Sequence, residues 1–151
     1  MESHYQKAIH YFNNSYNCAQ SIFAAYLDHT DVDETDSLKI ATAFGGGIAD
    51  LQKTCGAISG ALMVLGATLY NPQNPAVTKD IVNQYSETLI NLIEKKYGSS
   101  ECARLTNIDF ATQKPLDDTL KSKMHETCYQ VIEDVCIILD EMIKSKNAGQ
   151  K

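Results

Sequence analysis

The hydrophobic positions of this chain repeat with a helical period over almost its whole length. Apolar residues recur at spacings of three and four, and no alternating strand pattern of useful length occurs. The main predicted helices cover residues 3–12, 17–29, 35–44, 54–70, 75–97 and 117–144. A short helical turn is expected to begin at Ser99 or Ser100 and to contain Cys102, and residues 106–115 are expected to be irregular. The pattern predicts an all-α fold, a single-domain bundle of five or six helices.

Turn-forming residues separate these helices. The Asn13-Asn14-Ser15 cluster ends the first helix, because such side chains bond their own backbone. Gly45-Gly46-Gly47 predicts a flexible connection, and Gly98 is placed to be the left-handed residue after the long helix. We expect one helical domain over residues 1–145 and a frayed tail over residues 146–151.

The segment 54–70 carries no charge and contains three glycines, Gly56, Gly60 and Gly66. It is shorter than the roughly 20 apolar residues that a membrane-spanning helix needs. It therefore predicts a glycine-rich central helix, buried in a soluble bundle. Small residues at Gly56, Ala57 and Gly60 form a flat face, which favours either close helix packing or space for a site beside Cys55.

Composition narrows the possible functions. The 151 residues are 44% hydrophobic and 21% charged, which is typical of a globular domain. The net charge of −6 argues against nucleic acid as a partner, because phosphate binding requires a basic face. The N-terminus lacks the basic and apolar blocks of a signal peptide. We therefore expect a cytoplasmic protein with no membrane association.

Five cysteines are the candidate chemistry: Cys18, Cys55, Cys102, Cys128 and Cys136. In a reducing compartment structural disulfides are rare, so these residues are buried hydrophobes, metal ligands or redox groups. The chain contains no C-x-x-C motif, so a shared site would have to be assembled from separate helices.

Three of the cysteines fall in predicted first helical turns. Cys18 follows Asn17, Cys55 follows Thr54, and Cys102 follows the two serines. Free amides and the helix dipole stabilise negative charge there, so these thiols are expected to lose a proton more easily. Packing as small hydrophobic residues remains the alternative for each cysteine.

The last helix carries the other two cysteines. Cys128 shares a stripe with Val131, Val135 and Leu139 and is expected to face the core or a buried site. Cys136 lies at the edge of this stripe and is predicted to be a packing residue.

Histidines and acidic residues give weaker signals. His125 precedes Cys128 by three residues, so it is either a ligand or acid–base partner of that thiol or a surface residue. Residues 28–36 contain five acids, which predict a solvated loop rather than a cation site. His4, His10 and His29 show no ligand spacing.

Several segments together resemble the C_GCAxxG_C_C proteins, a redox-active family of small helical proteins found mainly in anaerobic prokaryotes. The segments are Asn17-Cys18-Ala19-Gln20, Phe44-Gly45-Gly46-Gly47-Ile48, Cys55-Gly56-Ala57-Ile58-Ser59-Gly60-Ala61, Gly98-Ser99 before Cys102, and His125 before Cys128-Tyr129-Gln130-Val131. By this resemblance the four family cysteines fall on Cys18, Cys55, Cys102 and Cys128, and Cys136 lies outside the pattern.

The resemblance implies a redox function based on a four-cysteine site. The four cysteines match the ligand set of an iron–sulfur cluster, with zinc as the alternative metal. The site serves either electron transfer or thiol/disulfide chemistry; in the second case Cys55 is the predicted low-pKa nucleophile and Cys18 the second catalytic cysteine. The partner is a redox protein or a small-molecule oxidant or reductant. The competing function is a non-catalytic helical interaction module, metal-free or stapled by zinc, that forms a homodimer.

Overall fold

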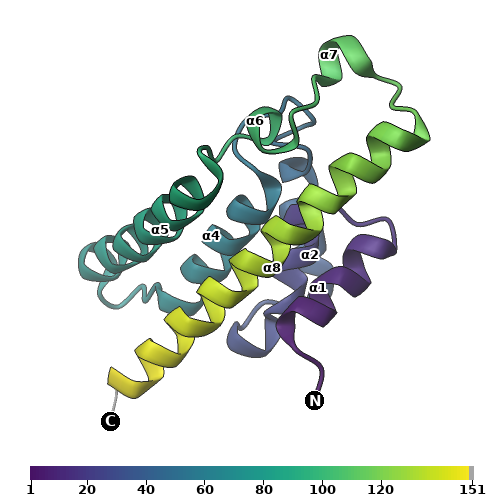
Figure 1. Cartoon of the computed structure of the whole chain (residues 1–151). Helices are drawn as coiled ribbons and strands as arrows, with labels where there is room; N and C mark the ends of the chain where they lie inside the picture. Colours follow the sequence, from purple (N-terminus) through teal and green to yellow (C-terminus); the bar gives the residue numbers. More distant parts are fainter. Residues whose placement is uncertain (150–151) are drawn as a thin grey trace.

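The computed structural model describes residues 1–149, and all regular secondary structure in this range is helical (Figure 1). The all-α prediction is therefore confirmed. The α-helices are α1 (His4–Asn13), α2 (Cys18–Ala25), α3 (Glu34–Ala41), α4 (Gly56–Leu69), α5 (Pro75–Tyr97), α6 (Cys102–Thr106), α7 (Phe110–Gln113) and α8 (Asp118–Gly149). Two 3-10 helices, η1 (Leu27–His29) and η2 (Thr42–Phe44), follow α2 and α3.

The number of helices differs from the prediction, since residues 1–149 form eight α-helices rather than five or six. One of the additional helices is α7, in a segment predicted to be irregular. Asp109 caps it by accepting a hydrogen bond from the Ala111 amide at 2.8 Å, and Gln113 accepts one from the Asp109 amide at 2.7 Å. Polar side chains stabilise this short helix, so no periodic pattern of hydrophobic residues marks it in the sequence.

The last helix is longer than predicted. It continues to Gly149 rather than ending at residue 144, and residues 150–151 of the predicted tail lie outside the described part of the chain. The Lys146 ammonium donates a hydrogen bond to the Thr68 carbonyl at 3.0 Å, and Ile143 is buried one turn earlier. These contacts attach the last turns of α8 to the end of α4.

The long helix α8 runs the length of the molecule and packs against α1, α2, α4, α5 and α6 (Figure 1). Helices α1 and α2 lie on one side of it, and α4 and α5 lie on the other. The largest fully buried side chains are Ile22, Tyr26, Ile58, Val64, Leu65, Leu89, Ile93, Val131, Ile132, Val135, Cys136 and Leu139. They belong to one hydrophobic core, to which α1 contributes Ala8.

Helix α4 begins at Gly56, two residues later than predicted, because Thr54 pairs with Glu101 in an isolated β-bridge. Its residues 56–61 are all buried, and it packs against α2, α5 and α8. Within residues 1–149, no helix combines the length and the apolar character needed to cross a membrane.

Candidate functional site

The first two cysteines lie at adjacent helix N-termini. Cys18 is the first residue of α2, where the side chains and amides of Asn17 and Gln20 exchange two hydrogen bonds of 3.0 Å in a capping box. Cys55 occupies the N-cap position of α4 rather than its first turn. Its amide donates a hydrogen bond to the Ser100 carbonyl at 2.9 Å, which ties it to the segment that leads to Cys102.

Glycines bring these two helix starts together. A Cβ atom on Gly56 would lie 3.1 Å from the Cβ atom of Cys18, and one on Gly60 would lie 2.7 Å from the Ala19 carbonyl oxygen. The flat small-residue face is therefore used for close packing of α4 on α2. This packing places Cys18 directly beside the residue that follows Cys55.

Cys102 reaches the same region through backbone pairing. It is the first residue of α6, preceded by Glu101 at the N-cap position instead of the predicted serines. Its amide donates to the Lys53 carbonyl at 2.7 Å, and the next amide, of Ala103, donates to the Gln52 carbonyl at 3.3 Å. These bonds fix α6 against the segment immediately before Cys55.

The glycine segment before this pairing is an ordered turn and not the predicted flexible connection. Residues 46–50 all have positive φ values, between 52° and 73°. Amides of the turn bond back to earlier carbonyls, as in the 2.9 Å bond from Gln52 to Gly46 and the 2.7 Å bond from Lys53 to Gly47. A Cβ atom on Gly47 would lie 2.7 Å from that of Cys102, so this glycine permits the close approach of α6.

Helix α8 supplies the fourth cysteine. Cys128 is half-buried, and His125, one turn earlier, packs edge-on against Phe12 with ring centroids 5.4 Å apart. All four cysteines and His125 line one cavity of about 160 Å³. Apolar side chains form much of its wall: Phe12, Leu105, Phe110, Met124 and Val131. The four predicted cysteines thus lie on, or at the start of, four different helices and line one apolar cavity.

The thiols influence one another across this cavity. Interaction with the neighbouring Cys128 thiol, together with burial, raises the pKa of the Cys18 thiol well above its ordinary value of 9.0. Burial raises the pKa of Cys102 to about 12, and the charges of Cys55 and Cys18 contribute to that rise. Negative charge on any one of these sulfurs is therefore opposed by the others.

The prediction of a low-pKa nucleophile at Cys55 is wrong for the free thiol. The backbone amides of Ala57 and Ile58 lower the pKa of Cys55, as expected at a helix N-terminus. Burial and the nearby Cys18 outweigh them and raise the pKa of Cys55 to about 12. At neutral pH Cys55 is therefore a neutral thiol unless a cation lies beside it.

Cys136 is placed elsewhere. It is 1% exposed within the core and is not among the residues that line the cavity. Its carbonyl accepts a hydrogen bond from the Tyr26 hydroxyl at 3.0 Å. It is buried more completely than its predicted position at the edge of the helix stripe indicated.

Two features of the structure could not be predicted from the sequence. The buried side chain of Gln52 donates to the Ile108 carbonyl at 2.6 Å and accepts from the Phe110 amide at 2.8 Å, which holds the segment after α6 over the cavity. His4, Asp28 and His29 also converge, although no ligand spacing links them in the sequence. Both features join residues that are far apart in the sequence, so only the tertiary fold brings them together.

Comparison with known proteins identifies the family. A search of curated proteins and a search of solved structures gave no match. The family model described as "Putative redox-active protein (C_GCAxxG_C_C)" matches residues 16–142, a range that contains all four cavity cysteines. This match spans most of the chain, so the protein belongs to the C_GCAxxG_C_C family, whose description is redox-active.

Proposed function

We propose that Cys18, Cys55, Cys102 and Cys128 form a single redox site that holds an iron–sulfur cluster for electron transfer. One observation carries this proposal: these four cysteines line one cavity, whereas the fifth is buried in the core. The four thiolates are the usual ligand set of an iron–sulfur cluster, which supplies one-electron chemistry when bound.

The cavity suits a small polyatomic group. Its volume of about 160 Å³ is close to the roughly 150 Å³ of an engineered cavity that accepts benzene. Its apolar wall keeps water away from the sulfurs. The backbone amides of Ala57 and Ile58 favour negative charge on the Cys55 sulfur, and amides beside a cluster sulfur help to set the reduction potential of the cluster.

The electrostatics of the thiols also favour a cationic occupant. Ionised sulfurs are costly in this buried site, which is why the pKa values of Cys55 and Cys102 rise to about 12. Metal ions stabilise the thiolates by replacing their protons, so metal binding releases protons and strengthens with pH.

A cluster and a zinc staple require different spacings of the sulfurs. Four thiolates around one Zn²⁺ at about 2.3 Å lie roughly 3.8 Å apart. Among the described residues no three cysteine sulfurs lie within 4.8 Å of one another, so a single zinc ion would have to draw them inward. In a [4Fe–4S] cluster each thiolate binds a different iron, and wider spacing is required.

A second candidate is thiol–disulfide exchange by Cys18 and Cys128. The effect of the Cys128 thiol on the pKa of Cys18 favours it, because it marks these two thiols as neighbours in the cavity that both line. In this reaction a disulfide of the partner breaks and accepts two electrons and two protons, while a Cys18–Cys128 disulfide forms. The partner is then a disulfide-containing protein or a small disulfide.

Anaerobic purification tests the first candidate. We expect a brown protein with visible absorption, iron and acid-labile sulfide in near-equal amounts, and little zinc. Cys55→Ser should abolish the absorption and the iron while leaving the helix content by circular dichroism unchanged, because serine supplies no thiolate. Cys136→Ala is the matched control and should retain the cluster, with a stability loss of about 1 kcal/mol.

Each alternative has its own result. Protein without iron that forms a Cys18–Cys128 disulfide on oxidation, seen by peptide mass mapping, would replace the cluster with the exchange reaction. Stoichiometric zinc, or cysteines that bind nothing and resist oxidation, would replace both with the interaction module. Loss of iron in Cys136→Ala but not in Cys55→Ser would invert the assignment of site and packing residues.

A further inference from the structure

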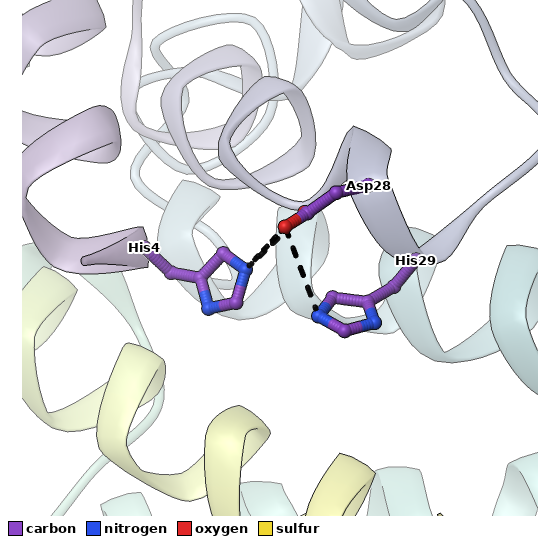
Figure 2. A group of neighbouring side chains, drawn as sticks. All are labelled: His4, Asp28 and His29. Carbon is purple, nitrogen blue, oxygen red and sulfur yellow. Dashed lines mark hydrogen bonds and ion pairs between the residues drawn. The ribbon is translucent and has the colours of Figure 1, made fainter. Parts of the chain in front are cut away.

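A second cluster of polar side chains lies at the N-terminal end of α1. His4 begins α1, and Asp28 and His29 belong to η1; their nitrogen and oxygen atoms lie within 4.8 Å of one another. The Nε2 atom of His4 is 3.2 Å from Asp28 Oδ1, and that of His29 is 4.0 Å from Asp28 Oδ2. In Figure 2 both rings turn a nitrogen toward the Asp28 carboxylate.

A fourth residue fixes the orientation of His4. Its Nδ1 atom lies 2.7 Å from Asp140 Oδ1, and the Tyr26 hydroxyl donates to the same oxygen at 2.8 Å. The His4 ring also stacks on Tyr26 with centroids 4.0 Å apart. Metal-binding histidines are held in this way, with one nitrogen on a carboxylate and the other free to face the ion. The contact with Asp140 therefore orients the Nε2 atom of His4 toward Asp28.

We propose that His4, Asp28 and His29 bind a divalent transition metal ion of the zinc class. Imidazole and carboxylate donors suit such ions, and three protein ligands leave a position open to water or an external ligand. Asp140 is the positioning residue. Zinc bonds of about 2.0–2.2 Å need donor atoms roughly 3.4 Å apart, so the three side chains must close slightly around the ion.

The side chains are free to make this movement. The exposed fraction is 49% for Asp28 and 30% for His29, whereas His4 is held in place at 18%. The Lys7 ammonium lies 3.3 Å from Asp28 Oδ2 and competes for the carboxylate. An ion entering from solvent must share Asp28 with this lysine or displace it.

This site is independent of the cysteine cavity. Asp140 follows Cys128 by twelve residues of α8, which places the two sites about 18 Å apart along the helix. His4 also precedes the segment that matches the family model. The inference therefore does not rest on the proposed redox function.

Ring-nitrogen NMR of the four histidines tests the proposal residue by residue. Zn²⁺ is added to the full chain, with no affinity tag attached, and the resonances of His4 and His29 are expected to shift together and saturate. His10 and His125 are internal controls; a shift of His125 alone reports zinc at the cysteines. Asp28→Asn should weaken the response of His4 and His29 by at least about tenfold. His10→Gln should leave that response unchanged.

Lys7→Met separates a metal site from an ordinary ion-pair network. Removing the competing ammonium should tighten zinc binding several-fold, whereas loss of a purely structural ion pair would leave zinc binding unchanged or weaker. Unchanged His4 and His29 resonances at saturating zinc would overturn the proposal. Equal shifts of all four rings, or undiminished binding by folded Asp28→Asn, would show non-specific surface binding and overturn it as well.

Discussion

At the scale of single residues, the wall of the cysteine cavity depends on unusual backbone conformations. Ile48, Ala49 and Asp50 adopt positive φ values of 65°, 52° and 58°. Each such residue costs about 1–2 kcal/mol relative to a right-handed conformation, and glycine alone avoids the cost. The bonds from Lys53 to Gly47 and from Cys102 to Lys53 hold the turn closed. This local strain is maintained beside the cysteines, as is common at functional sites.

Gly47→Ala should therefore disturb the site as well as the turn. Its φ is 73°, and the new Cβ atom would lie 2.6 Å from the Lys53 nitrogen and 2.7 Å from the Cys102 Cβ atom. We expect a loss of about 2–5 kcal/mol in urea unfolding, the sum of a left-handed alanine and overpacking. Gly98→Ala is the control: its φ is 81° but its Cβ atom would meet nothing within 4 Å, so it should lose only about 1–2 kcal/mol. Equal losses would show that α6 does not press on the turn.

At the scale of helices, the crossing of α2 and α4 positions the site. Helix α4 contains glycines that each cost about 1 kcal/mol relative to alanine. Two of them face α2: Gly56 lies against Cys18, and Gly60 lies against Ala19 and Ile22. The third, Gly66, faces open space. Glycine lowers the intrinsic stability of the helix at positions 56 and 60, but it allows α4 to pack closely against α2.

This contrast predicts opposite effects of one substitution. Gly60→Ala should destabilise the protein by about 1–3 kcal/mol, because the new Cβ atom would lie 2.7 Å from the Ala19 carbonyl oxygen. Gly66→Ala should stabilise it by about 1 kcal/mol through helix propensity alone. Denaturant midpoints of the two variants measure both effects. A Gly60→Ala protein as stable as Gly66→Ala would mean that α2 and α4 are further apart than the structure shows.

At the scale of the whole molecule, burial governs the chemistry of the thiols. Cys55 and Cys102 have pKa values of about 12 in the folded chain, above the ordinary value of 9.0. Between these values the unfolded chain has lost thiol protons that the folded chain still holds. The free energy of unfolding therefore falls as pH rises through this range, and it is independent of these thiols below about pH 8.

Reduced protein kept free of metal should accordingly lose stability between pH 8 and about pH 11. Urea unfolding under anaerobic conditions measures the change. A variant with both Cys55→Ser and Cys102→Ser should show a smaller decrease over the same range, since serine does not titrate there. Tyrosines contribute equally to both proteins and cancel in the comparison. The same decrease in both proteins would show that these thiols are not buried as the structure places them.

Several helix termini were predicted from local sequence, because capping acts within one turn. Residues 75–97 form the predicted helix because Pro75 suits the first position and Gly98 takes the left-handed conformation that ends it. Ser3 and Asn17 begin α1 and α2 with capping boxes. The family resemblance was likewise contained in the sequence, and the family model confirms it over residues 16–142.

The contacts between helices could be known only from the tertiary structure. Local sequence placed Cys18, Cys55 and Cys102 near helix starts, but only the packing of α2, α4, α6 and α8 brings them and Cys128 to one cavity. Packing also removes water from the sulfurs, which reverses the pKa shift expected from their helix positions. The meeting of His4 with Asp28 and His29 has the same origin. Capping and turn formation act between neighbours in sequence, whereas burial and ligand geometry depend on residues that only the folded chain brings together.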